Sequence, residues 1–125
     1  MPEHTLELFY LSTCDTSRRI MRQLEVHKFP FRFQDIKTEK ITPAQIDRLS
    51  KLAGGYAPLF SKVAIKYRSM RLKEKQPSEM QIRELILAEY TFLKRPVFII
   101  DDTIFIGNAP GNIRNVQSAL SKIKT

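Results

Sequence analysis

The stretch LELFYLSTCDTS, residues 6–17, decides the fold of this chain. Its first half, 6–11, is short, apolar and aromatic, which is typical of a buried strand. Its second half, 12–17, is a turn rich in residues that cap helix N-termini. We therefore expect a helix to follow, and its inner face should carry Ile20, Met21 and Leu24.

A second strand is expected over residues 29–36, because Phe31 and Phe33 alternate there with Arg32 and Gln34. A strand, a helix and a strand within about 30 residues form a βαβ unit. The two strands of such a unit are parallel.

The next part of the chain, from about 42 to 90, is predicted to be helical. Thr42 opens a helix with a capping box completed by Gln45, and Gly54 and Gly55 end that helix. Residues 56–75 should contain short helical turns. Ser78 and Gln81 form a second capping box that opens another helix. The inward positions of these two helices are Ile46, Leu49, Leu52, Ile82, Leu85 and Ile86.

The C-terminal part is expected to add two strands and a helix. Residues 96–100 form the third strand, 101–103 a tight turn, and 104–106 the returning strand of a hairpin. The last helix should bury one apolar face, formed by Ile113, Val116, Leu120 and Ile123. The order β-α-β, helical insertion, β-β-α predicts one α/β domain over residues 1–125, with a four-stranded mixed sheet and an insertion over about 42–90.

Composition narrows the class of protein. Apolar residues make up 42% and charged residues 27% of the 125 residues, as in ordinary globular proteins. No apolar run is long enough to cross a bilayer, and Met1 to Glu7 lack the features of a signal peptide. We therefore expect a cytoplasmic protein with no membrane partner.

The chain is basic, with a net charge of +8. Such a charge can attract nucleic acids, acidic protein surfaces or small anions. The basic residues are scattered, however, and no aromatic RNA-binding signature or zinc-finger spacing accompanies them. We interpret the charge as a solvated basic surface and expect no direct binding of nucleic acid.

Cys14 is the only cysteine, and it lies where the first strand passes into the first helix. There the open amide groups and the positive end of the helix dipole favour a thiolate, which is the reactive form. Ser17 can turn its hydroxyl toward the sulfur, at the position of the second cysteine in C-x-x-C proteins. In the alternative interpretation, Cys14 is a small apolar residue and residues 15–17 serve only as helix caps.

A second motif supports the reactive interpretation. Arg95 and Pro96 precede the third strand, at the place where thioredoxin-like folds carry a cis-proline that faces the active cysteine. Together, residues 11–18 and 93–100 resemble the two motifs of the arsenate reductase/Spx family. The resemblance covers about residues 6–123 and implies a thioredoxin-like fold.

The resemblance also implies an activity. In family members that reduce arsenate with glutathione and glutaredoxin, the cysteine attacks the oxyanion and arginines hold it. By this resemblance Cys14 is the nucleophile, Ser17 and Arg18 stabilise the thiolate or the oxyanion, and Arg95 binds the oxyanion. Pro96 is the structural cis-proline. No bound cofactor or metal is expected; glutathione would act as a co-substrate, alone or through glutaredoxin, on a small oxyanion or a disulfide.

The chain also departs from the family pattern. Ser61 stands where the arsenate reductases carry an arginine, and Lys62 is the residue that could contact an anion instead. Gly107 or Asn108 replaces another arginine, and Tyr10 replaces a histidine upstream of the cysteine. The alternative function is that of an Spx-like adaptor that binds RNA polymerase with little or no catalysis.

Overall fold

A computed structural model of the protein describes residues 4–123. The chain divides into two compact units, one formed by residues before 40 together with those from 95 onward, the other by Lys40–Lys94. The second unit contains the helical region expected over about 42–90. The interpretation of residues 1–125 as one domain stays a prediction.

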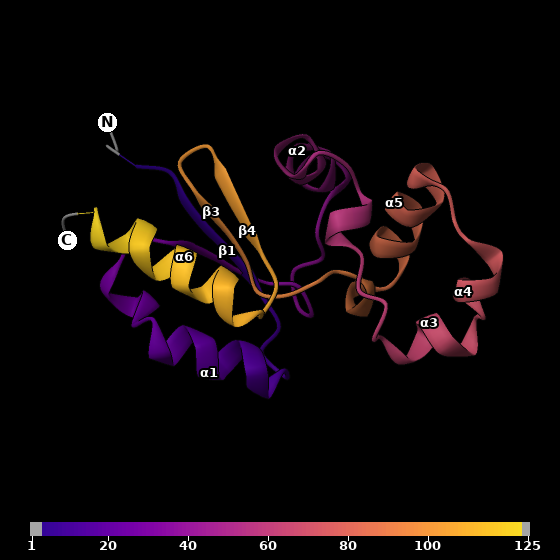
Figure 1. The fold of residues 1–125 in the computed structure, drawn as a ribbon, viewed down its shortest axis with the longest axis horizontal. Coiled ribbons are helices and arrows are strands. Elements are labelled where there is room, and N and C mark those ends of the chain that lie inside the picture. Colours follow the sequence, from indigo (N-terminus) through magenta and orange to yellow (C-terminus); the bar gives the residue numbers. More distant parts are fainter. Residues whose placement is uncertain (1–3, 124–125) are drawn as a thin grey trace. The chain divides into compact units, whose positions relative to one another are not determined.

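The first unit contains a four-stranded mixed sheet, as predicted (Figure 1). Its strands are β1 (Leu6–Tyr10), β2 (Arg32–Asp35), β3 (Val97–Ile100) and β4 (Thr103–Ile106). The spatial order is β2-β1-β3-β4. The β1 and β2 strands are parallel, which confirms the βαβ unit, and the other two neighbouring pairs are antiparallel.

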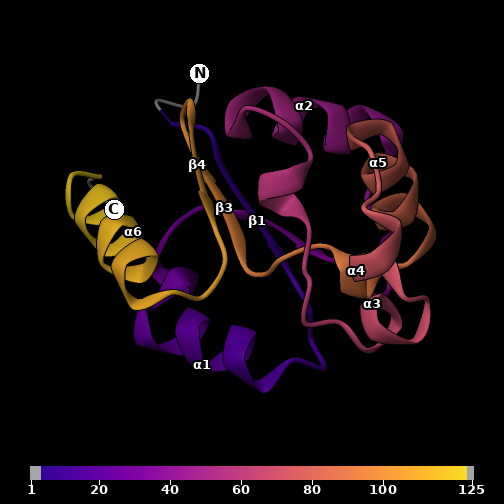
Figure 2. The ribbon, with the colours of Figure 1, turned by 45° about the vertical axis from the view of Figure 1, so that its right-hand side comes forward.

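Two helices of the first unit pack on one face of the sheet (Figures 1 and 2). They are α1 (Asp15–Gln23), which is followed by the short 3-10 helix η1 (Val26–Lys28), and α6 (Pro110–Ser121). The apolar residues that meet between helices and sheet are Leu6, Leu8, Ile20, Leu24, Val26, Phe31, Phe98, Ile100, Ile113, Val116 and Leu120. This core holds the N-terminus of α1 against the end of β1.

The second strand differs from a simple apolar-in pattern. Phe31 is buried, but Phe33 is 41% exposed and Gln34 is buried. The reason is that β2 is an edge strand, so the Phe33 ring has only Tyr10 and Phe31 as ring neighbours among the described residues. On the other face of the strand, the Gln34 Nε2 donates a 3.1 Å hydrogen bond to the Glu39 carbonyl.

The β3–β4 hairpin has a two-residue turn, one residue shorter than predicted. Asp101 adopts the left-handed region at φ 57°. Its carboxylate accepts a hydrogen bond from the Thr5 amide at 3.0 Å and lies 3.0 Å from His4 Nδ1. The His4 side chain is therefore bound to the hairpin.

The helices and strands assigned to the second unit are all helices. They are α2 (Pro43–Ala53), η2 (Ala57–Leu59), α3 (Ile65–Ser69), α4 (Leu72–Lys75), α5 (Glu79–Ala88) and η3 (Tyr90–Phe92). Both predicted capping boxes are formed, by Thr42 with Gln45 and by Ser78 with Gln81. The inward faces are narrower than predicted, because Leu52 and Leu85 are only half-buried.

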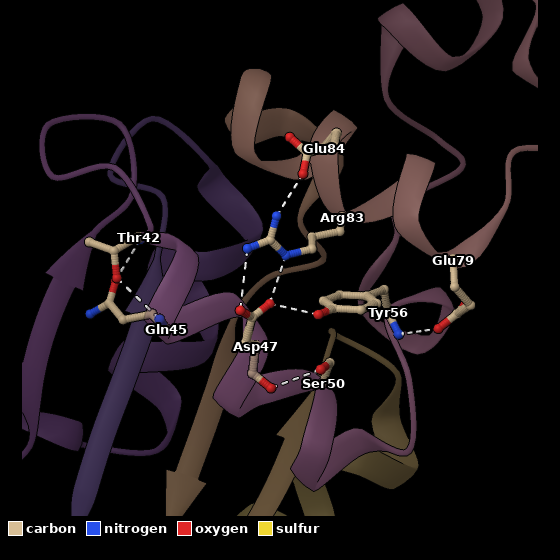
Figure 3. Close-up of polar contacts among 8 residues, drawn as sticks. All are labelled: Thr42, Gln45, Asp47, Ser50, Tyr56, Glu79, Arg83 and Glu84. Atoms are coloured by element: carbon tan, nitrogen blue, oxygen red, sulfur yellow. Dashed lines mark hydrogen bonds and ion pairs between the residues drawn. The ribbon is translucent and has the colours of Figure 1, made fainter.

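A polar cluster ties α2, η2 and α5 together (Figure 3). The Arg83 guanidinium donates to both Asp47 carboxylate oxygens, at 2.7 and 3.2 Å, and the Tyr56 hydroxyl donates to Asp47 Oδ1 at 2.6 Å. The Arg83 hydrogen bond, and then that from Tyr56, lower the pKa of Asp47 to about 2. Nearby, the Glu79 carboxylate accepts the backbone amides of Tyr56 and Ala57.

Candidate active site

Cys14 lies at the N-cap of α1, at the end of the loop that follows β1. Its backbone is extended, with φ −96° and ψ 112°, and its amide donates to the Leu11 carbonyl at 3.0 Å. The Cys14 carbonyl accepts the Arg18 amide at 3.1 Å, which closes the first turn of the helix. Cys14 is neither fully buried nor fully exposed.

Asp35 fixes the start of this loop. Its Oδ1 accepts the amide of Ser12 at 3.2 Å and that of Lys37 at 3.2 Å. Partial burial raises the pKa of Asp35, but hydrogen bonding from Ser12 and Lys37 outweighs it, and the net shift is downward. Sequence reasoning missed this residue. The expected parallel strands indicate only that residues near 10 and 35 lie at one edge of the sheet. The observed register pairs Asp35 with Tyr10.

Ser17 faces Cys14 from the first turn of α1. Its side chain is fully buried, and its Oγ makes no hydrogen bond of ordinary geometry to any residue that the structure describes. The hydroxyl still lies near enough to the sulfur to lower the Cys14 pKa, together with the Ser17 backbone amide. Ser17 therefore places a buried hydroxyl near the Cys14 sulfur.

Arg95 approaches the same sulfur from the segment before β3. Partial burial raises the pKa of Cys14, whereas the Ser17 donors, a hydrogen bond from Arg95 and the charge of Arg95 lower it. The lowering contributions outweigh burial, so the thiol ionises below its usual pKa. The next residue, Pro96, is buried, and the Arg95–Pro96 peptide bond is cis. Ser17 and Arg95 thus both act on the Cys14 sulfur, and the catalytic roles expected for these three residues stay predictions.

Arg18 is directed elsewhere. Its guanidinium donates to Asp15 Oδ1 at 2.5 Å, and both side chains are largely exposed. Asp15 therefore neutralises the cation nearest to Cys14 in sequence. The predicted role of Arg18 on an oxyanion stays a prediction.

Lys62 belongs to the second unit and is exposed. It follows Ser61, which is buried and donates its amide to the Phe92 carbonyl at 2.7 Å. The predicted contact of Lys62 with an anion stays a prediction.

Gly107 occupies the turn after β4. Either Gly107 or Asn108 stands where the family pattern has an arginine. Gly107 has φ 89°, a region that favours glycine. Its amide donates to the Pro96 carbonyl at 2.9 Å, and its own carbonyl accepts Asn112 Nδ2 at 2.8 Å. The turn therefore supports the Pro96 segment through backbone contacts and adds no cation at this position.

These groups provide an activated nucleophile beside a cation and the open amides of a helix. Such a set suits attack on a sulfur or on an anionic centre. Within residues 4–123 no three His, Cys, Asp or Glu side chains are grouped so that they could hold a metal ion. None of the helices over these residues is long and apolar enough to cross a membrane.

A family model described as the ArsC family matches residues 9–116. None of the curated proteins compared with the chain matches it.

Solved structures with the same fold cover nearly the whole chain. A Brucella melitensis protein described as arsenate reductase (ArsC) related has a TM-score of 0.69 and 23% identity, over 92% of this chain and 96% of its own. An arsenate reductase from Vibrio cholerae has a TM-score of 0.76 and 14% identity, over 92% and 99%. A Staphylococcus aureus protein has a TM-score of 0.72 and 21% identity, over 89% and 97%. At these identities the structures establish the fold.

Proposed function

This chain belongs to the ArsC family, and on that premise we propose that it is a thiol-redox enzyme in which Cys14 is the nucleophile. One observation carries the proposal: Ser17 and Arg95 converge on the Cys14 sulfur and lower its pKa against the opposing effect of burial. A thiol buried for packing alone would have its pKa raised.

The proposed reaction begins with attack by the Cys14 thiolate on the glutathione sulfur of a mixed disulfide. A new S–S bond forms, the old one breaks, and the other sulfur leaves as a thiolate. Because the chain has a single cysteine, the resolving thiol comes from outside. A glutathione thiolate attacks the Cys14 disulfide, releases the Cys14 thiolate and departs as glutathione disulfide.

Arsenate is the oxyanion substrate that the proposal includes. The thiolate bonds to arsenic, and one arsenate oxygen leaves as water after protonation. A glutathione thiolate then attacks the Cys14 sulfur, and the S–As bond breaks with its electron pair on arsenic, which leaves as As(III). A second glutathione thiolate attacks the resulting Cys14–glutathione disulfide, releases the Cys14 thiolate and departs as glutathione disulfide. Arg95 would hold the anion with its guanidinium, and the open amides of residues 15–17 would complete the cradle.

The proposal places this chemistry in the cytoplasm, where glutathione and glutaredoxin keep thiols reduced. The adaptor function on RNA polymerase is the alternative. It predicts that partner binding continues in a Cys14→Ser variant and that no thiol-dependent turnover occurs with the native chain.

Turnover assays test the proposal. We expect glutathione-dependent reduction of arsenate or of a glutathione mixed disulfide. The rate is measured as NADPH consumption in an assay coupled to glutathione reductase. Cys14→Ser should abolish it. Arg95→Ala should lower kcat/KM by about tenfold or more, because one charge-assisted hydrogen bond is lost.

Arg22→Ala is the matched control, since Arg22 is an exposed arginine on the same helix as Ser17. It should retain native turnover. The adaptor function would replace the proposed enzyme function if neither substrate were turned over and both the native and the Cys14→Ser chains bound RNA polymerase.

A further inference from the structure

The second unit exposes two aliphatic side chains to an unusual degree. Val63 is 92% exposed and Ile65 is 87% exposed, the highest values among the large apolar residues that the structure describes. Their neighbours in the same segment, Ala64 and Leu72, are buried. Large aliphatic groups held open to water in a row are typical of surfaces that contact another molecule.

The same segment is strongly basic. Residues 62–75 contain six Lys or Arg side chains and a single carboxylate, that of Glu74. Two of the cations are paired, Arg71 with Glu74 at 3.3 Å and Lys66 with Glu89 at 2.7 Å. The remaining four have no carboxylate partner within residues 4–123: Lys62, Arg68, Lys73 and Lys75.

Several residues of this segment line one cavity of about 680 Å³. Its lining includes Lys62, Val63, Ile65, Arg68, Arg71 and Lys73. The cavity therefore combines an apolar rim with cations, and we call residues 62–75 the 62–75 surface.

We propose that the 62–75 surface docks an acidic, amphipathic segment of a partner protein. The carboxylates of such a segment would meet Arg68 and Lys73, and its apolar side chains would cover Val63 and Ile65. The charge of the surface selects an acidic partner, and its aliphatic groups require that the partner also carry apolar side chains.

The chemistry of the surface favours a protein over a nucleic acid or a membrane. Single-stranded nucleic acids are held by stacking on aromatic rings. The aromatic residue of this segment, Tyr67, packs its ring against Phe60 at 5.8 Å. Membrane-surface helices bury a long apolar face, whereas α3 has five residues.

Selection from a displayed library of random peptides on the full chain tests the proposal. We expect the enriched peptides to be acidic and to contain aliphatic or aromatic residues. Their affinity for a Val63→Asp/Ile65→Asp double variant, and for an Arg68→Glu/Lys73→Glu double variant, should fall by about tenfold or more. Raising the salt concentration should weaken binding to the native chain.

Met80→Asp is the matched control, because Met80 is an exposed apolar residue of the same unit that does not line this cavity. It should bind the selected peptides as the native chain does. All variants are compared by circular dichroism and thermal unfolding, so that loss of fold is separated from loss of docking.

Three results would overturn the proposal. The first is selection of neutral or basic peptides, and the second is equal binding to the Val63→Asp/Ile65→Asp variant. The third is tighter binding of DNA oligonucleotides or of phosphatidylserine vesicles than of any peptide. Cys14→Ser should leave peptide binding unchanged. The docking proposal and the thiol-redox proposal can therefore be refuted separately.

Discussion

At the scale of single residues, the chemistry depends on how Ser17 and Arg95 act on the sulfur of Cys14. Burial alone would make Cys14 less acidic, and Ser17 and Arg95 reverse that effect. Ser17 acts from the same helix turn, whereas Arg95 comes from a segment far away in sequence. The balance between these contributions can be changed one residue at a time.

Removing either donor should raise the pKa of Cys14. In Ser17→Ala and in Arg95→Gln, burial is opposed by fewer groups, so the midpoint of the alkylation rate against pH moves upward from the native value. Iodoacetamide kinetics over a range of pH measure that midpoint. Arg22→Gln should leave the midpoint where it is, and a native midpoint at or above the usual 8.5 or so of cysteine would refute the activation of the thiol.

The site could be predicted from the sequence only where local pattern or resemblance reached it. Cys14 and Ser17 follow from a strand-to-helix junction, and Arg95 follows from the family motif. Asp35 was missed because its role depends on the register of two parallel strands. The pairing of Arg18 with Asp15 depends on side-chain conformations, which a sequence pattern does not specify.

At the scale of elements, the junction between α2 and η2 relies on two adjacent glycines. Gly54 has φ 84° and open space where the methyl group of an alanine would lie. Gly55 has φ 146°, and Glu79 Oε1 lies 2.8 Å from the corresponding methyl position. The Glu79 carboxylate is the group that accepts the amides of Tyr56 and Ala57. The two glycines therefore meet different constraints.

Replacing these glycines by alanine separates backbone strain from crowding. Gly54→Ala should lower the free energy of unfolding by about 1–2 kcal/mol, because a side chain is disfavoured at positive φ. Gly55→Ala should cost more, since the new methyl group also displaces the Glu79 carboxylate. Urea unfolding of both variants gives the comparison, and an equal loss in the two would show that the carboxylate moves freely.

The Asp47–Arg83 ion pair should make the free energy of unfolding depend on pH. Hydrogen bonding from Arg83 and Tyr56 lowers the pKa of Asp47 from 3.8 to about 2. The stabilisation is therefore complete above about pH 4 and is lost as pH falls toward 2. Asp47→Asn should unfold more easily than the native protein near neutral pH, and the difference should shrink in acid. Urea unfolding at several pH values measures it; a difference independent of pH would contradict an ionic origin.

Elements were predictable where one short pattern specifies them. The two capping boxes and the glycine at the end of α2 appear as expected. The burial of individual side chains was less predictable, as Phe33 and Leu85 show. Alternation reveals that a strand exists, but whether a given face is covered depends on the strand's place in the sheet and on neighbouring elements.

At the scale of the whole molecule, the order of elements was predictable because parallel strands joined by a helix leave few arrangements. The βαβ unit accounts for the β1–β2 pair and the hairpin for the β3–β4 pair, whereas the antiparallel pairing of β1 with β3 was not predicted. The division into two compact units was less accessible, because compactness depends on tertiary contacts that the sequence does not state.

A single cysteine limits the whole chain to one thiol adduct. Incubation with glutathione disulfide should add at most one glutathione to each native chain and none to Cys14→Ser. Intact-mass spectrometry measures the adduct. The yield should rise with pH through the pKa of Cys14, since the thiolate is the attacking form. A native chain that stays unmodified at every pH would show that the sulfur cannot be reached.

The buried hydroxyl of Ser17 shows how small a change could give the protein a second thiol. Exchanging that one oxygen for sulfur, in Ser17→Cys, would place a second thiol three residues after the first in the same helix turn. The protein would then hold its own resolving partner and could close an internal disulfide with no outside thiol. The native protein needs an external thiol to resolve an oxidised Cys14. Replacing one oxygen by sulfur would give a protein that records its own oxidation as an internal disulfide.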